Sequence, residues 1–378
     1  MTSPYVGLDA RAFWRAAAAN PAHDLYRKKF DISPQDSLMT AGSCFAQHIA
    51  NTLRHRGYNV LDAEPTPRML PEDSANKFGY NLYSARYGNI YTARQLLQLF
   101  KEALGRFEPK NWIWKKGDRY FDALRPNVEP NGLTSEEEVI AHRAAHLDAV
   151  RSLLKKVDVF VFTFGLTEAW RDKESGTIYP TAPETIAGTF DSSKFEFVNF
   201  TFNEVYRDFL LVRKIIQRRR PGAKFVITVS PVPLTATASG NHVLAATVYS
   251  KSVLRAVAGQ LAKKFDDVDY FPSYELIAGH TTRAAYYERN LREVSAEGVA
   301  AAMSAFVSQH AAGGSPQGAA EVPHGEVPQS VKRAQQRARR ARRARRAREI
   351  AERSGAPKKP KKNQNVVCEE MLLEAFSR

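Results

Sequence analysis

Short runs of apolar and β-branched residues alternate with longer amphipathic segments through most of this chain. Two of the runs, 157–164 and 224–230, are almost continuously apolar, which is typical of strands buried on both faces of a parallel sheet. Strands that alternate with helices indicate an α/β fold with a doubly wound parallel sheet, because crossovers place helices on its faces. We expect strands at 37–41, 58–61, 157–164, 224–230 and 267–271, and helices at 44–56, 92–106, 135–155, 203–219, 247–264 and 295–309.

Charge is distributed unevenly along the chain. The formal net charge is +15, but residues 331–362 hold 15 Lys and Arg against two Glu, so the rest of the chain is close to neutral. Residues 311–330 are rich in Gly, Pro and Ser, which is typical of a linker. We therefore predict five parts: an N-terminal arm at 1–36, an α/β domain at 37–310, a linker at 311–330, a flexible basic segment at 331–362 and an apolar patch at 363–378.

Several classes of protein are excluded by what the chain lacks. It has no run of about 18 apolar residues, so no transmembrane helix is expected. The first thirty residues lack the apolar core of a secretory signal. Two cysteines, Cys44 and Cys368, cannot form a disulfide framework and are typical of a reducing compartment. We therefore expect a cytoplasmic protein.

The basic segment contains an Arg-Arg-Ala repeat between Arg337 and Arg348. Three residues turn a helix by about 300°, so the alanines form no continuous apolar face. Such a segment attracts anionic partners through charge, including nucleic acid, anionic lipid and acidic polysaccharide. It has no interleaved aromatic residue for base stacking, so sequence-specific reading of nucleic acid is not expected. A merely solvated tail is the alternative.

The junction between the first expected strand and the first expected helix is the first place for chemistry, because ligands bind at the carboxyl ends of the strands in open α/β sheets. Gly42 permits a tight turn there, and Ser43 falls at the expected N-cap of the helix. A hydroxyl at this end of the helix dipole suits a nucleophile, although serine also caps helices without further function. Cys44 is a rival nucleophile or a small buried apolar residue.

The stretch Gly42-Ser-Cys-Phe-Ala46 spells the motif of the GSCFA family, a bacterial group that resembles SGNH-type esterases and lipases. The resemblance covers about residues 10–305. Further stretches that resemble the family are Asn81–Thr92, Phe164–Trp170, Val229–Pro233 and His242–Lys251.

This resemblance implies a three-layer αβα domain of the SGNH or flavodoxin-like kind, with Ser43 as nucleophile. It implies an acyl esterase or O-acyltransferase, a hydrolase-type chemistry, acting on acylated glycans or related esters. Gly88 and Asn89 are candidates for the glycine block of SGNH enzymes, and Gly165 to Glu168 stand where SGNH enzymes carry Gly-x-Asn-Asp. The expected oxyanion or substrate-binding residues are therefore Cys44 through its backbone amide, Gly88, Asn89, Gly165 and Thr167.

One departure affects the proton-transfer partners. SGNH enzymes carry Asp-x-x-His before the last helix, and this chain has Asn290 and Glu293 there. A serine without a base is a weak nucleophile. We expect His242, in a turn-rich loop at the same sheet edge, to act as base together with Glu168, and His280 is a second choice. A non-catalytic ligand- or polyanion-binding protein on a degenerate hydrolase fold is the alternative function.

No metal and no cofactor are expected. His142 and His146 are spaced as an i, i+4 pair that can bind zinc, but no third ligand follows at a useful distance.

Aromatic residues between Trp112 and Arg125 predict either a lid over the site or a small satellite core, and Arg171 and Tyr179 could belong to the same surface.

Overall fold

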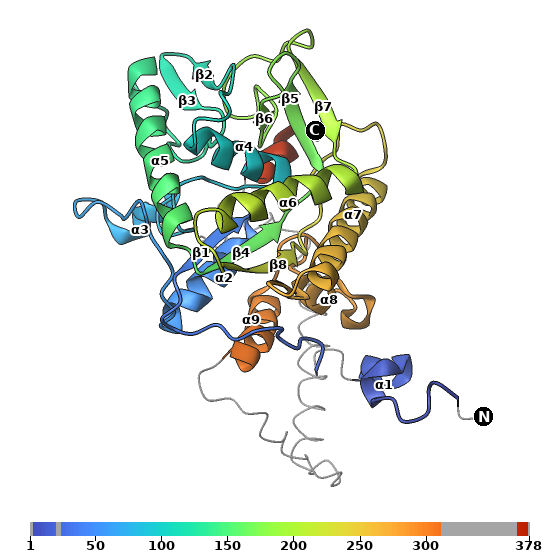
Figure 1. Ribbon diagram of the computed structural model, residues 1–378. Coiled ribbons are helices and arrows are strands. Elements are labelled where there is room, and N and C mark those ends of the chain that lie inside the picture. Colours follow the sequence, from blue (N-terminus) through green and yellow to red (C-terminus); the bar gives the residue numbers. More distant parts are fainter. Residues whose placement is uncertain (1–2, 20–23, 311–368, 377–378) are drawn as a thin grey trace, which may run out of the picture. The chain divides into compact units, whose positions relative to one another are not determined.

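A computed structural model describes residues 3–19, 24–310 and 369–376, whose centre is a four-stranded parallel sheet (Figure 1). The strands are β1 (Leu38–Gly42), β4 (Val159–Phe164), β8 (Lys224–Val229) and β9 (Val268–Tyr270), in that order across the sheet. The α/β expectation is confirmed. The expected linker at 311–330, the basic segment at 331–362 and residues 363–368 and 377–378 of the expected patch lie outside the described residues.

The expected strand at 58–61 is wrong. Val60 forms one isolated parallel bridge with Leu38 on the outer side of β1. The Val60 amide turns back to the carbonyl of Tyr58 at 2.9 Å, so this segment does not continue the ladder. With this segment included, the order across the sheet is the Val60 segment, β1, β4, β8 and β9. In that order the direction of winding changes between β1 and β4.

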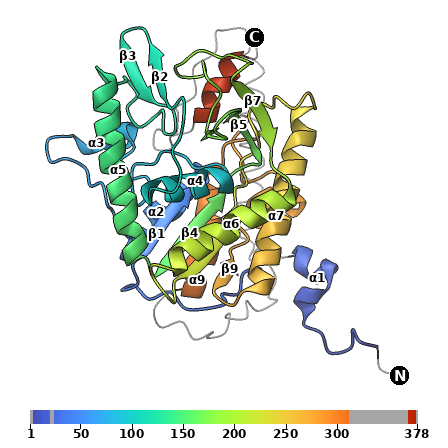
Figure 2. The same ribbon diagram turned by 45° about the horizontal axis from the view of Figure 1, so that its top comes forward.

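Two layers of helices cover the sheet, as the alternation of side chains along β4 requires. Phe160 and Phe162 pack with α4 (Ala93–Ala103), α5 (Glu136–Lys156), α6 (Phe202–Gln217) and α7 (Val243–Lys264). Val159 and Val161 pack on the opposite face with α2 (Phe45–His55), α8 (Ser273–Ala278) and α9 (Ala296–His310). The two views in Figures 1 and 2 show the sheet between these layers.

A second, antiparallel sheet follows the end of β4. It has the order β6 (Ile178–Tyr179), β5 (Glu168–Asp172) and β7 (Phe195–Asn199). A hairpin of β2 (Ile113–Lys116) and β3 (Arg119–Asp122) packs on it, and Trp114, Phe121 and Tyr179 are buried between them. The aromatic segment therefore forms a satellite core. Arg171 pairs with Glu196 at 2.7 Å on β7.

The remaining elements are short. They are η1 (Ala10–Ala12), α1 (Trp14–Ala19), α3 (Glu72–Ala75), η2 (Asn76–Phe78), η3 (His280–Thr282) and η5 (Glu369–Phe376). The last of these is drawn in red in Figures 1 and 2. Among the helices of the described residues, none is both long and apolar enough to cross a membrane.

Candidate active site

The turn from β1 into α2 is held against β4 by Gly42. Its φ of +144° lies in the region that favours glycine, and a methyl group there would lie 2.6 Å from the Thr163 carbonyl oxygen. The next amide, of Ser43, donates to that same oxygen at 3.3 Å. The Gly42 carbonyl accepts from the amide of Ile90 at 2.9 Å. Ser43 is therefore fixed between β4 and the segment that contains Gly88 and Asn89.

Ser43 lies one residue before the helix N-cap, which is Cys44, so the expected N-cap position is wrong by one residue. The reason is that the Ser43 amide still bonds to β4 and thus belongs to the end of the sheet. The Ser43 side chain is 2% exposed, and its Oγ has no hydrogen-bond partner among the described residues. Ser43 therefore does not cap α2 with its side chain, and Cys44 is buried beside it.

The loop after β4 covers Ser43. A methyl group at Gly165 would lie 3.0 Å from both the Ser43 Cβ and the Tyr91 carbonyl oxygen. That carbonyl accepts hydrogen bonds from the amides of Gly165 and Leu166 at 3.0 and 3.1 Å. Ser43 and Gly165 therefore meet where the ends of β1 and β4 adjoin. This is the place where doubly wound sheets bind ligands.

Asn89 presents a fixed amide at this place. Its Oδ1 lies 2.5 Å from the Tyr83 hydroxyl and accepts from Gln47 Nε2 at 3.1 Å. The same Tyr83 hydroxyl is 3.1 Å from the Ser43 carbonyl oxygen. Because Oδ1 is committed to donors, the Nδ2 group points the other way as a donor. The expectation that Asn89 supplies a hydrogen-bond donor to the site is thus compatible with its geometry.

Lys251 is a site residue that was not predicted from the sequence. Its Nζ donates to the Gly165 carbonyl at 2.6 Å, and its side chain is buried. Burial lowers the pKa of Lys251 to about 8, although negative charge at Glu370 and Cys44 opposes the shift. The amide of Thr167 donates to Ser250 Oγ at 3.0 Å, which attaches α7 to this loop. The available signal was the family-like stretch Tyr249–Lys251.

The C-terminal residues Glu369 and Glu370 also lie in the site, which the expected apolar patch did not anticipate. Asn89 Nδ2 and the Tyr91 hydroxyl both donate to Glu369 Oε2, the latter at 2.6 Å. Glu370 forms an ion pair with Arg292 at 2.9 Å. Burial raises the pKa of both glutamates, and these hydrogen bonds and charges oppose the shift.

Glu168 and His242 have separate hydrogen-bond partners in the described part of the chain. Glu168 begins β5 and accepts from the Thr237 hydroxyl at 2.8 Å. Burial raises the pKa of Glu168, and the charge of Glu370 adds to this effect. His242 is the exposed N-cap of α7, where its Nδ1 accepts from the Leu244 amide at 3.1 Å. Across the described ranges, no hydrogen bond or ion pair connects His242 with Ser43 or Glu168.

The other expected residues have local roles. The Thr167 hydroxyl donates to Asn199 Oδ1 at 2.6 Å, so its proton is already committed. A methyl group at Gly88 would lie 3.7 Å from Glu369 Oε1. Asn290 Oδ1 accepts from the amides of Arg292 and Glu293 at 3.1 and 3.0 Å, which makes a turn. His280 stacks on Trp14 with ring centroids 5.1 Å apart.

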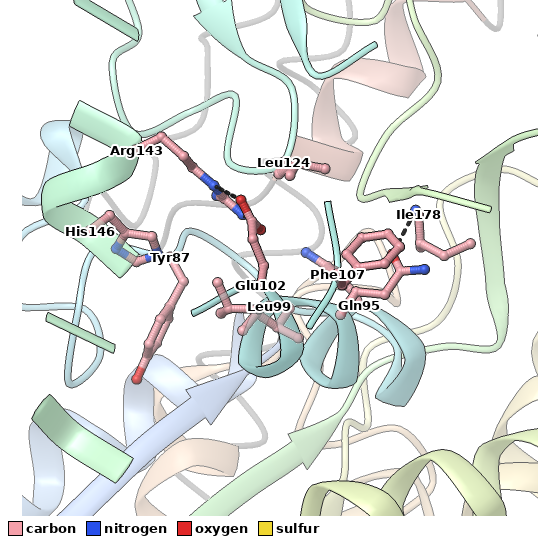
Figure 3. A pocket seen from close by; sticks show the side chains of 11 residues that line it. Tyr87, Gln95, Leu99, Glu102, Phe107, Leu124, Arg143, His146 and Ile178 are labelled. Carbon is pink, nitrogen blue, oxygen red and sulfur yellow. Dashed lines mark hydrogen bonds and ion pairs between the residues drawn. The ribbon is translucent and has the colours of Figure 1, made fainter. Parts of the chain in front are cut away.

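A small cavity lies beside α4 and α5, and neither Ser43 nor Lys251 lines it. Figure 3 shows His146 near Tyr87, and Arg143 reaching Glu102. Its volume of about 20 Å³ is enough for one water molecule and too small for an acyl substrate. His146 Nδ1 bonds to Glu64 at 2.7 Å. Among the described residues, no cluster of three His, Cys, Asp or Glu side chains is arranged to hold a metal ion.

This arrangement defines an α/β protein with a buried serine at the switch point of a parallel sheet, next to an oriented amide and a buried lysine. The model of the GSCFA family matches residues 37–306, and the chain belongs to that family. A comparison with curated proteins found no match.

Proposed function

We propose that this protein is an SGNH-like acyl esterase or O-acyltransferase with Ser43 as its nucleophile, acting on acylated glycans or related esters. One observation supports this most. The Ser43 hydroxyl is buried at the switch point and has no hydrogen-bond partner within residues 3–19, 24–310 and 369–376. A buried hydroxyl without a partner costs free energy, so its retention favours a role in binding or chemistry.

In the proposed reaction, Ser43 Oγ attacks the carbonyl carbon of the ester and gives its proton to a base. The bond from that carbon to the leaving alcohol then breaks, and the alcohol takes up a proton. Water or an acceptor hydroxyl attacks the acyl-enzyme and releases Ser43. Hydrolase and transferase differ in which of these two nucleophiles reaches the acyl group.

The oxyanion would be bound by the Cys44 amide, by Gly88 and by Asn89. Asn89 is the best supported of these, because Tyr83 and Gln47 orient its amide. Gly165 contributes close packing against Ser43. Thr167 is less well supported, because its hydroxyl is bonded to Asn199.

Two sets of residues can accept the serine proton in this proposal. His242 and Glu168 were expected from the sequence. Lys251 is the structural alternative, because its ammonium is bonded to Gly165, and Gly165 packs against Ser43. A buried lysine with a lowered pKa can serve as a base near neutral pH.

A non-catalytic ligand-binding protein is the second candidate. Asn290 and Glu293 replace the acid and base of the related enzymes. A chain of this kind would use the same site to bind a ligand without turnover. The basic segment 331–362 would then attach the protein to an anionic partner, in the cytoplasm, in either case.

A fluorophosphonate probe separates these two functions. The enzyme predicts labelling of the full-length chain that is lost in Ser43→Ala and kept in Cys44→Ala. Cys44→Ala is the matched control, because Cys44 is the neighbouring buried nucleophile. Absence of labelling in every form of the protein supports the binding function, and loss of labelling in Cys44→Ala alone makes Cys44 the nucleophile.

A further inference from the structure

Two consecutive carboxylates from the end of the chain are buried in the Ser43 site. Glu369 is 1% exposed, and it contacts Asn89, which lies 280 residues earlier in the sequence. Glu370 is also buried, at 9% exposed. In the same short element, Glu374 is exposed. Burial of two adjacent carboxyl groups is unfavourable unless hydrogen-bond donors and cations surround them.

Glu369 occupies one of the donors assigned to the oxyanion, the Asn89 amide, together with the Tyr91 hydroxyl. Its Oε2 accepts from the Asn89 amide and from the Tyr91 hydroxyl at 2.6 Å. Its Oε1 has no hydrogen-bond partner in the part of the chain that the structure describes. A methyl group at Gly88 would lie 3.7 Å from Oε1. The carboxyl group therefore lies against Gly88 and Asn89, two of the residues assigned to the oxyanion.

Glu370 occupies a second, cationic subsite. Arg292 Nη2 donates to its Oε2 at 2.9 Å, and both side chains are about one tenth exposed. The electrostatic field of Lys251 also acts on Glu370. Arg292 precedes α9 and Lys251 lies on α7, so two distant elements bring positive charge to one carboxylate. A neutral ester has no group that would pair with this positive charge.

We propose that the Ser43 site takes acyl esters that carry a carboxylate, and that Glu369 and Glu370 occupy it as an internal competing ligand. Glu369 holds the position of the acyl group, and Glu370 holds the position of the substrate carboxylate on Arg292. This inference rests on the function proposed above for its substrate, but the anion-binding site itself does not. Substrate must displace the C-terminal pair before Ser43 can react.

The first test measures how far the C-terminal pair Glu369 and Glu370 blocks access to Ser43. Full-length Glu369→Gln/Glu370→Gln protein should react with the fluorophosphonate probe about tenfold faster than wild type, because a larger fraction of molecules is open. Glu374→Gln is the matched control, since it removes the same charge from an exposed position of the same element. Equal rates in all three proteins would overturn the inhibitory part of the proposal.

The second test measures substrate class. The double variant should hydrolyse 4-acetoxybenzoate with a kcat/KM about tenfold higher than that for its methyl ester, which differs by the carboxylate charge. No preference between the two esters overturns the assignment of a carboxylate-bearing substrate.

The third test does not depend on activity. A fluorescein-labelled peptide of residues 369–376 should bind the double variant about tenfold more tightly than the same peptide with Gln at 369 and 370. Equal binding of the two peptides overturns the anion site. If the peptides differ in affinity but Ser43 is never labelled, the anion site stands and the proposed enzymatic function fails. If Ser43 is labelled but the peptides bind equally, the proposed enzymatic function stands and the anion site fails.

Discussion

Lys251 donates a 2.6 Å hydrogen bond from its buried ammonium group to the backbone carbonyl of Gly165. Gly165 in turn packs against the Cβ of Ser43, so the lysine and the serine both lie beside Gly165. Burial lowers the pKa of this lysine to about 8. The neutral amine is therefore accessible just above neutral pH, where it can accept a proton.

The pH dependence of Ser43 labelling should report this lysine. We expect the rate to rise with pH around a midpoint of about 8, and Lys251→Met should remove that rise. The charge of Glu370 holds the pKa of Lys251 up, so Glu370→Gln should move the midpoint to lower pH. The rate of fluorophosphonate labelling between pH 6 and about 10 measures both effects. An unchanged profile in Lys251→Met would assign the proton to His242 or Glu168 instead.

Gly165→Ala should impair the site with limited damage to the fold. The added methyl group would lie 3.0 Å from the Ser43 Cβ and from the Tyr91 carbonyl, so Ser43 or the loop must shift. We expect labelling to slow by about a hundredfold and unfolding free energy to fall by about 1–3 kcal/mol. Gly259→Ala is the control, because the nearest atom to a methyl group there is the flexible Arg255 guanidinium. Normal labelling of Gly165→Ala would show that this close packing is unimportant.

Arg292→Met should release the C-terminal element. The substitution removes the cation that pairs with Glu370 at 2.9 Å, and a buried carboxylate without its partner is strongly unfavourable. Amide hydrogen exchange in residues 369–376 should accelerate by about tenfold or more. Arg292→Met/Glu370→Gln should exchange more slowly than the single variant, since no charge is then left unpaired. Unaltered exchange in Arg292→Met would contradict the contact.

Stability should decrease as pH falls from about 6.5 to about 4, partly because of His310. Burial, assisted by the charge of Lys28, lowers the pKa of His310 from 6.5 to about 4. In this window the unfolded chain binds a proton that the folded chain does not, so acid favours unfolding. The expected loss at pH ~5 is up to about 2 kcal/mol.

Urea unfolding at pH 7.5 and pH ~5 measures this dependence. His310→Gln should show a smaller difference between the two pH values than wild type. His55→Gln is the control, because His55 is an exposed residue of α2. A His310→Gln protein with the full wild-type pH dependence would exclude this histidine as a cause.

The parallel sheet was predictable because buried strands have a strong local signal. The apolar runs at 157–164 and 224–230 became β4 and β8, with boundaries within two residues of those expected. The segment 58–61 pairs with β1 only at the Val60–Leu38 bridge, because the Val60 amide bonds locally to Tyr58 and the ladder goes no further. The antiparallel sheet was missed because β5 mixes Glu168, Arg171 and Asp172 with apolar residues, and the burial of such a strand is decided by its neighbours.

The sequence by itself determined the α/β class, the strand–turn–helix at Ser43 and the match to the family motif, because these depend on residues that are close together in the chain. Tertiary structure alone decided which charged groups surround the serine. Lys251, Arg292, Glu369 and Glu370 come from three distant segments, and local sequence marks none of them as buried. The free energy cost of burying a charged side chain depends on the groups that pack around it. Those groups come together only once the chain has folded.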